Sequence, residues 1–146
     1  TLHKSKLWNN SLVIMVPDPL GAWPQHPDNF KPWRYHIPLV WVGGALREPM
    51  VVKTLGSQQD IAATLLSQLG IEHKNMIFSK DMLNPAVNHF AFFLPNDGIG
   101  MITEDNQLIY DNQLKKTVYD AGKEKGKNLR SGKALLQVLF DDISKR

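Results

Sequence analysis

The run Ser11-Leu12-Val13-Ile14-Met15-Val16, which leads into Pro17-Asp18, decides how this chain is expected to fold. The run is apolar and β-rich, and Asn9-Asn10 and Pro17 bound it. Such a run predicts a strand that is buried on both faces, as in a parallel sheet. A second run of this kind, Leu39-Val40-Trp41-Val42, ends at Gly43-Gly44. Together they predict neighbouring strands of one buried sheet in an α/β fold.

The segment between the two strands, from Pro17 to Pro38, contains six of the nine prolines of the chain. Regular structure is not expected there, because proline fixes φ and lacks a backbone donor. Its aromatic residues indicate an ordered, packed loop: Trp23, Phe30, Trp33 and Tyr35. Long loops in compact domains are usually functional or disordered, so this loop is a place to look for a site.

A helix is predicted after the second strand. Ser57 and Asp60 have the spacing of a capping box, and Gly70 supplies a C-terminal stop. Between them lies an apolar stripe at helical period: Ile61, Ala62, Leu65, Leu66 and Leu69. Of these, Ile61, Leu65 and Leu69 are expected to pack against the two strands.

The second half of the chain predicts an antiparallel meander and a closing helix. Its short apolar runs are separated by turn residues: Phe90–Leu94, Ile99–Thr103, Leu108–Tyr110 and a return at Lys116–Tyr119. The closing helix is expected to start near Ser131, with an apolar face formed by Ala134, Leu135, Val138, Leu139 and Ile143.

Composition excludes several classes of protein. With 146 residues, 42% of them hydrophobic and 21% charged, the chain has the size and composition of one globular domain. The absence of cysteine excludes disulfides, thiolate metal sites and a cysteine nucleophile. Much of the net charge of +3 lies in Lys123–Lys133, where a solvated basic loop is favoured over a phosphate-binding patch, so nucleic acid is not an expected partner.

Candidate functional residues follow the first strand, where α/β proteins place their sites. Asp18 comes two residues after the strand, and the loop adds His26, Asp28, His36, Lys31 and Arg34. Carboxylates and imidazoles are ligands for divalent metals, whereas Lys and Arg are suited to hold a sulfate or phosphate oxyanion. A second interpretation stays open, in which Asp18 starts a turn and His36 is structural. The chain contains neither a serine elbow nor a Gly-rich phosphate loop.

Three segments, Trp8–Asp18, His36–Gly44 and Ser57–Gly70, carry a resemblance to a known family. They are similar to a family strand ending in Asp-His-Gly, to a strand of the type His-Ile-Pro-Met-Leu-Trp, and to a helix of the type Ser-Gln-x-Asp-Ile-Ala-x-Thr-Leu-Leu that ends in Leu-Gly. In this order they resemble the C-terminal third of the sulfatase family of the alkaline-phosphatase superfamily. The branch they resemble most is the lipoteichoic-acid-synthase-like, phosphoglycerol-transferase-type branch of bacterial envelopes.

The resemblance implies an alkaline-phosphatase-like α/β fold. Residues 1–87 would be the C-terminal part of the sulfatase-like core, and residues 88–146 the meander and closing helix. The parent would be a sulfuric ester hydrolase or phosphoglycerol transferase whose metal-activated hydroxyl nucleophile lies upstream of Thr1, so this chain alone is expected to be inactive.

The resemblance also implies a site that is shared with the missing N-terminal part of the same protein. A divalent metal (Mn, Mg, Ca or Zn) would be held partly by Asp18, and its binding to this chain alone would be weak or absent. His36, Arg34 and Lys31 would contact a sulfate or phosphate ester substrate. The parent is expected to be membrane-anchored and to work on the periplasmic or extracellular side of the cell envelope.

One departure from the family pattern leaves alternatives open. Pro19 stands where the family has a metal-binding histidine, and proline offers no ligand atom. The parent would then bind metal weakly, recruit His26 or His36 instead, or be a degenerate, non-catalytic binding or scaffold domain. An unrelated α/β domain is the third interpretation. An unpaired sheet edge would also allow the isolated chain to form a homodimer.

Overall fold

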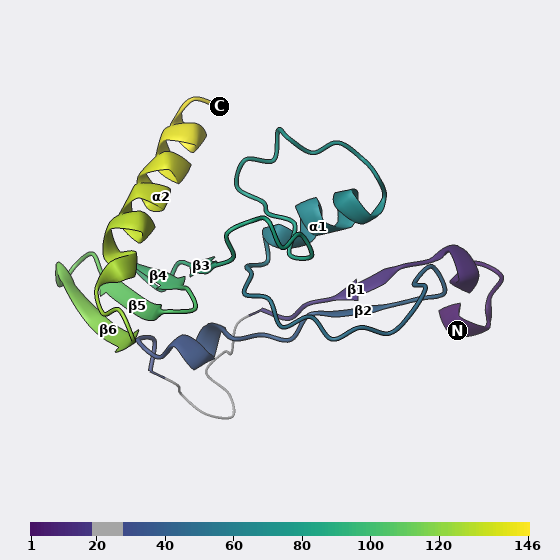
Figure 1. Ribbon diagram of the computed structural model, residues 1–146, viewed down its shortest axis with the longest axis horizontal. Coiled ribbons are helices and arrows are strands. Elements are labelled where there is room, and N and C mark those ends of the chain that lie inside the picture. Colours follow the sequence, from purple (N-terminus) through teal and green to yellow (C-terminus); the bar gives the residue numbers. More distant parts are fainter. Residues whose placement is uncertain (19–27) are drawn as a thin grey trace.

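The computed structural model describes residues 1–18 and 28–146, which form a mixed α/β structure with two antiparallel sheets (Figure 1). The two-stranded sheet contains β1 (Val13–Met15) and β2 (Val40–Val42), and the four-stranded meander has the order β3-β4-β5-β6. The other elements are η1 (Leu2–Lys4), η2 (Trp8–Asn10), η3 (Pro32–Tyr35), α1 (Asp60–Gln68), β3 (Ala91–Phe93), β4 (Gly98–Ile102), β5 (Asn106–Asp111), β6 (Lys116–Gly122) and α2 (Lys127–Ser144). The predicted meander and closing helix are therefore confirmed.

The strands β1 and β2 lie side by side as expected, but the predicted parallel orientation is wrong. They pair antiparallel, with Val13 opposite Val42 and Met15 opposite Val40. A parallel pair needs a crossover connection, which is usually a helix, and the connection here provides only the short η3 among its described residues. The strands are also not buried on both faces, because Met15 is 48% exposed and Val40 is 43% exposed.

The hydrophobic core of the described residues lies mainly in the meander. Its buried apolar side chains include Phe92, Ile99, Met101, Leu108 and Ile109, whereas Ala63 and Pro32 are buried outside it. Register places Ile99 opposite Tyr110 and Met101 opposite Leu108, so these side chains share one face of the sheet. The helix α2 covers that face, with Gly132 against Ile99 and Met101.

The opposite face of the meander is covered by η3. Phe93 and Gly100 are paired across β3 and β4, and a Cβ at Gly100 would collide with the Phe93 ring. The Tyr35 ring of η3 stacks on the Phe93 ring, and the two ring centroids are 4.2 Å apart. Tyr35 is therefore packed as predicted, whereas Trp33 is 50% exposed and Trp23 lies outside the described residues. The expectation that the loop lacks regular structure is wrong at Pro32–Tyr35.

The helix α1 ends as predicted but buries a different face. Gly70 has a φ of +66°, and the Ile71 N–H donates to the Leu66 carbonyl, which is the pattern of a Schellman motif. The predicted stripe is only partly covered, and Leu69 is 61% exposed. The buried residues of the helix are Asp60, Ala63 and Thr64, because the loop at residues 79–82 packs there.

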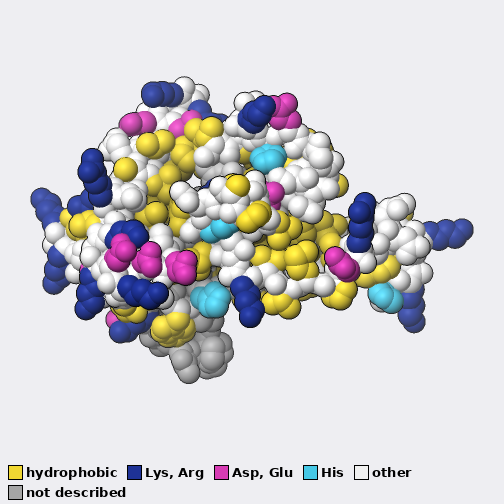
Figure 2. All heavy atoms as spheres, in the orientation of Figure 1, with side chains coloured by type: hydrophobic (Ala, Val, Ile, Leu, Met, Phe, Trp, Pro, Cys, Tyr) yellow, Lys and Arg dark blue, Asp and Glu magenta, His cyan; other side chains and the backbone are white. Residues whose placement is uncertain are grey.

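The first half of the chain exposes much more apolar surface than the meander does. Figure 2 shows hydrophobic side chains gathered over the β1–β2 sheet. Exposed residues of this half include Met15, Leu39, Val40, Met50 and Val51, and Val51 reaches 84% exposure. A two-stranded sheet alone is marginally stable in water, so this part of the fold has the properties of a sheet that lacks its neighbours.

The helix α2 begins at Lys127, one turn earlier than predicted, so the basic segment Lys123–Lys133 is partly helical. Its first turn is fixed by two buried asparagines. The Asn128 side chain donates to the carbonyls of Asn106 (2.6 Å) and Met101 (3.2 Å), and Asn106 Oδ1 accepts from the Asn128 N–H (3.0 Å). Among the described residues, no helix combines the length and apolar character that crossing a membrane requires.

We predict that Asn128→Ala destabilises the chain by about 2–4 kcal/mol, because each buried polar group that loses its partner costs roughly 1–3 kcal/mol. Urea unfolding measures the change. The matched control is Asn75→Ala, at an exposed position, which should change stability by less than about 0.5 kcal/mol. Equal effects of the two substitutions would contradict the anchoring role of Asn128.

Candidate functional site

Two of the site residues predicted from the sequence, Asp18 and His36, belong to segments that flank one end of the β1–β2 sheet. Because the two strands are antiparallel, the chain leaving β1 at Met15 and the chain entering β2 at Val40 are neighbours. Asp18 follows β1 and His36 precedes β2, so the pairing places both segments at the same end of the sheet. Both side chains are exposed. His26 and Pro19 lie outside the described residues.

The three cationic candidates belong to one short element. Lys31 precedes η3, Arg34 lies within it, and His36 follows it, with its N–H bonded to the Trp33 carbonyl. Lys31 and His36 are exposed, and Arg34 is half-buried. A single turn of 3-10 helix therefore carries or flanks all three side chains, and the positive charges of Lys31 and Arg34 suit an anionic ligand.

Tyr35 holds this element in place. Its ring stacks on Phe93, and its hydroxyl donates to the Asn29 carbonyl at 3.1 Å. Burial raises the pKa of Tyr35, and the neighbouring Arg34 charge partly offsets that rise. The tyrosine is thus a neutral anchor at physiological pH, and it fixes η3 to the meander.

The described residues do not by themselves form a metal site. Within residues 1–18 and 28–146, no three His, Cys, Asp or Glu side chains come together as ligands. Asp18 is a carboxylate at the sheet end, and the preceding Pro17 carbonyl accepts a bond from Gln58 Nε2 at 3.0 Å. This bond ties the segment that carries Asp18 to the turn before α1.

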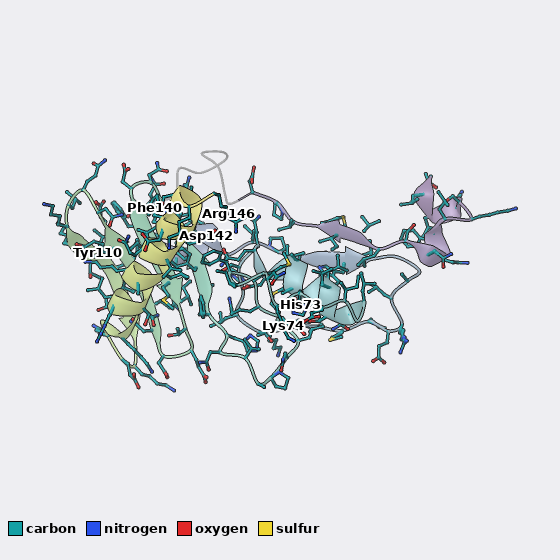
Figure 3. The ribbon with its side chains drawn as sticks, turned by 90° about the horizontal axis from the view of Figure 1, so that it is seen from above. His73, Lys74, Tyr110, Phe140, Asp142 and Arg146 are labelled. Atoms are coloured by element: carbon teal, nitrogen blue, oxygen red, sulfur yellow. The ribbon has the colours of Figure 1, made fainter. Side chains whose placement is uncertain are left out.

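A serine and a histidine also meet at the end of α1. Ser67 Oγ lies 3.3 Å from His73 Nε2, and His73 Nδ1 lies 3.1 Å from the Ile71 carbonyl. Figure 3 shows His73 and Lys74 beside α1. The negative end of the helix dipole lies here, so it would oppose the oxyanion that an acyl-transfer serine must stabilise. We therefore assign His73 a structural role.

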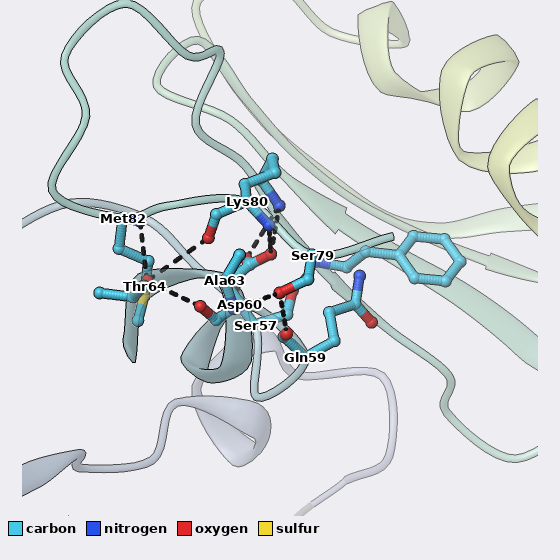
Figure 4. Close-up of polar contacts among 9 residues, drawn as sticks. Ser57, Gln59, Asp60, Ala63, Thr64, Ser79, Lys80 and Met82 are labelled. Atoms are coloured by element: carbon cyan, nitrogen blue, oxygen red, sulfur yellow. Dashed lines mark hydrogen bonds and ion pairs between the residues drawn. The ribbon is translucent and has the colours of Figure 1, made fainter. Parts of the chain in front are cut away.

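The most buried charged group is Asp60, at the start of α1 (Figure 4). Its Oδ2 accepts from the Ser57 N–H (2.8 Å), and its Oδ1 accepts from the Lys80 N–H (2.9 Å). Lys80 Nζ contacts both carboxylate oxygens at 2.8–2.9 Å and lies 3.9 Å from the centroid of the Phe90 ring. Because the carboxylate is fully buried and fully paired, it acts as a structural centre.

The predicted capping box is therefore half right. Asp60 reaches back to the Ser57 N–H as a capping box requires, but the Ser57 hydroxyl does not cap the helix. Ser57 Oγ instead accepts from the Phe92 N–H at 2.8 Å, on the free edge of β3. Spacing within the sequence cannot reveal this contact, because its partners are 35 residues apart.

Two further hydroxyls, which the sequence did not single out, fasten the loop at residues 79–82 to α1. Ser79 Oγ accepts from the Ala63 N–H (2.9 Å) and donates to the Gln59 carbonyl. Thr64 Oγ1 donates to the Asp60 carbonyl (2.7 Å) and accepts from the Met82 N–H (2.9 Å). These bonds surround Asp60 and exclude solvent from its salt bridge.

Comparison with solved structures shows the fold to which this arrangement belongs. The chain is similar to a crystal structure, at 1.95 Å, of a protein in the alkaline phosphatase superfamily from Vibrio parahaemolyticus. The TM-score is 0.60 with 22% sequence identity over 78% of this chain. The chain spans 31% of the length of that protein.

The chain therefore has part of an alkaline-phosphatase-like fold, which confirms the predicted fold class. No family model matches it, and no curated protein matches it. The finer resemblance to sulfatases and phosphoglycerol transferases stays a prediction.

We predict that Asp60→Asn destabilises the chain by about 3 kcal/mol, since breaking a buried ion pair typically costs 3–5 kcal/mol. The value lies at the low end because Lys80 keeps 15% exposure. The control is Asp142→Asn, which breaks the i,i+4 pair with the exposed Arg146 and should cost less than about 1 kcal/mol. Chemical denaturation measures the free energy of unfolding of both variants. If Asp60→Asn lowers that free energy by less than about 1 kcal/mol, Asp60 does not have the proposed structural role.

Proposed function

We propose that this chain is the C-terminal part of an enzyme that cleaves or transfers sulfate or phosphate esters. The observation that carries the proposal is the match to an alkaline phosphatase superfamily protein over 78% of the chain. Within that superfamily, the sequence resemblance favours a sulfuric ester hydrolase or a phosphoglycerol transferase of the bacterial envelope. In this proposal the nucleophilic hydroxyl lies outside the chain, on a segment that precedes it.

The exposed apolar surface supports a missing partner, which we propose is the N-terminal part of the same protein. The β1–β2 sheet has no further strands among the described residues. Trp41, on β2, has a buried Nε1–H that finds no acceptor within the described ranges. An added layer of the parent fold would cover Met15 and Val40 and could satisfy Trp41. In the isolated chain, a second copy would compete for the same surface.

The residues at the sheet end have distinct proposed roles. Asp18 would supply one carboxylate to a divalent metal, with the remaining ligands coming from outside this chain. When bound, the metal would supply a positive charge that favours deprotonation of the hydroxyl, and the described residues do not complete its site. Lys31, Arg34 and His36 would bind the non-bridging oxygens of the transferred group, where negative charge is concentrated.

A degenerate, non-catalytic domain of the same fold is the second candidate. The observation that favours it is Pro19, which occupies the position of the metal-binding histidine in the family pattern. Loss of a direct metal ligand usually costs more than the 10–100-fold typical of outer residues, so the substitution is a direct argument against strong metal binding.

We predict that Asp18→Ala lowers kcat/KM more than about 10–100-fold in a longer protein that contains this chain and the segments before it. Turnover of p-nitrophenyl sulfate, p-nitrophenyl phosphate and a phosphoglycerol lipid is measured. The control is Glu48→Ala, an exposed carboxylate that follows the opposite end of β2 and should leave kcat/KM unchanged. Absence of turnover with all three esters would favour the degenerate domain instead.

For the chain alone, we predict weak binding of Mn²⁺, Mg²⁺ and Zn²⁺, no tighter than roughly 10⁻⁴–10⁻³ M, the range of weak oxygen-ligand sites. The reason is that Asp18 offers a single carboxylate and Pro19 offers no ligand. Isothermal titration calorimetry measures the affinity. Tight stoichiometric binding that disappears in Asp18→Ala would show that the chain holds a complete site.

A further inference from the structure

A groove runs between α2 and the outer half of β5, away from the candidate site at the sheet end. Lys133, Gln137 and Phe140 lie at positions i, i+4 and i+7, so they share one side of α2. Tyr110 and Asn112 alternate on β5 and the residues that follow it, so both face this side of the helix. These residues line an open groove of about 440 Å³. Figure 3 shows Tyr110 beside α2, the helix that carries Phe140.

The groove contains a cation that is held in position without an acidic partner. Lys133 Nζ lies 3.7 Å from the centroid of the Tyr110 ring. Lys80 and Lys127 each contact a carboxylate, whereas no ion pair involves Lys133 in the part of the chain that the structure describes. A cation–π contact orients an ammonium but does not accept its three N–H donors in full, so Lys133 is ready to bind an anion.

The rest of the lining suits a ring with hydroxyl groups. Phe140 is 59% exposed, although it is large and apolar, and it forms a flat wall of the groove. Asn112 presents an exposed amide, and Gln137, whose Nε2 donates to Asp141 at 2.8 Å, keeps its carbonyl oxygen as an acceptor. Sugars stack C–H faces on aromatic rings and bond their hydroxyls to amides. A purely apolar occupant would leave both amides and the ammonium without a role.

We propose that this groove binds an anionic sugar, namely a pyranose that carries a sulfate, phosphate or carboxylate group. The sugar face packs on Phe140, its hydroxyls bond to Asn112 and Gln137, and its anionic group contacts Lys133. The inference does not rest on the proposed enzymatic function, because every residue that it uses belongs to the meander and α2.

The test is an NMR titration of the full 146-residue chain with a sulfated disaccharide, the same disaccharide without sulfate, and inorganic sulfate. Saturable shifts are expected at β5 and α2 with the sulfated sugar. The neutral sugar and inorganic sulfate should each bind at least tenfold more weakly. Equal binding of inorganic sulfate would reduce the groove to a simple anion site, and equal binding of the neutral sugar would remove the role of Lys133; either result overturns the proposal.

Variants identify the groove as the place of binding. Lys133→Gln and Phe140→Ala should each weaken the sulfated sugar at least tenfold. Lys125→Gln removes an exposed charge outside the groove and should leave the affinity unchanged. Tyr110→Phe keeps the aromatic ring below the Lys133 ammonium, so this variant should retain binding of the sulfated sugar. Unchanged NMR shifts away from the groove in Lys133→Gln and Phe140→Ala would show that their loss of affinity is local and is not a loss of folding. Equal weakening by Lys133→Gln and Lys125→Gln would indicate non-specific attraction and overturn the proposal.

Discussion

The buried carboxylate of Asp60 is the group on which the arrangement of the chain depends. An unpaired charge at zero exposure would be too costly, so each of its acceptor positions must be filled, and the groups that fill them come from different segments. Ser57 brings the turn before α1, and Lys80 brings the loop at residues 79–82. The same two residues also contact β3 and the residue just before it. The Ser57 hydroxyl accepts a hydrogen bond from the Phe92 N–H, and the Lys80 ammonium lies over the Phe90 ring. The pairing of one carboxylate thereby joins the first half of the chain to the edge of the second sheet.

A second connection explains how the candidate site is positioned. Tyr35 stacks on Phe93, one residue from the strand position that Ser57 holds, so η3 and α1 both attach to β3. The element η3 is thus held by the meander rather than by the small sheet, whereas the segment that carries Asp18 is tied to the turn before α1 through Gln58. The short β1–β2 pair gives direction to the segments that carry Asp18 and His36, and the antiparallel register brings those segments to one end.

The sequence predicted the elements better than their partners. Periodicity and turn residues located β3 to β6, α1 and α2, because these signals are local. Strand direction was missed, since an apolar run reads the same whether it pairs parallel or antiparallel. The spacing of Ser57 and Asp60 identified the correct residues but not the Phe92 contact, and nothing local distinguished Lys80 or Asn128 from exposed polar residues. The pairing of β1 with β2 brings the segments of Asp18 and His36 to one end of the sheet, but the roles of the predicted site residues stay a prediction. The groove beside α2 could not be found without the register of β5 and the position of Lys133.

The distribution of buried side chains divides the chain into a part that is complete and a part that is not. The meander encloses its own core between α2 and η3, whereas the region around β1, β2 and α1 fully buries Ala63 as its one apolar residue in the described ranges. The ester-cleaving chemistry that we propose belongs to the second region. There the two-stranded sheet exposes Met15 and Val40, and Trp41 Nε1 has no acceptor among the described residues. In our proposal, catalysis in this region requires the N-terminal part of the same protein, which would cover the exposed surface. The α2 groove is lined by residues of the meander and α2 and of the turn after β5, so the sugar binding that we propose can be measured on the chain by itself.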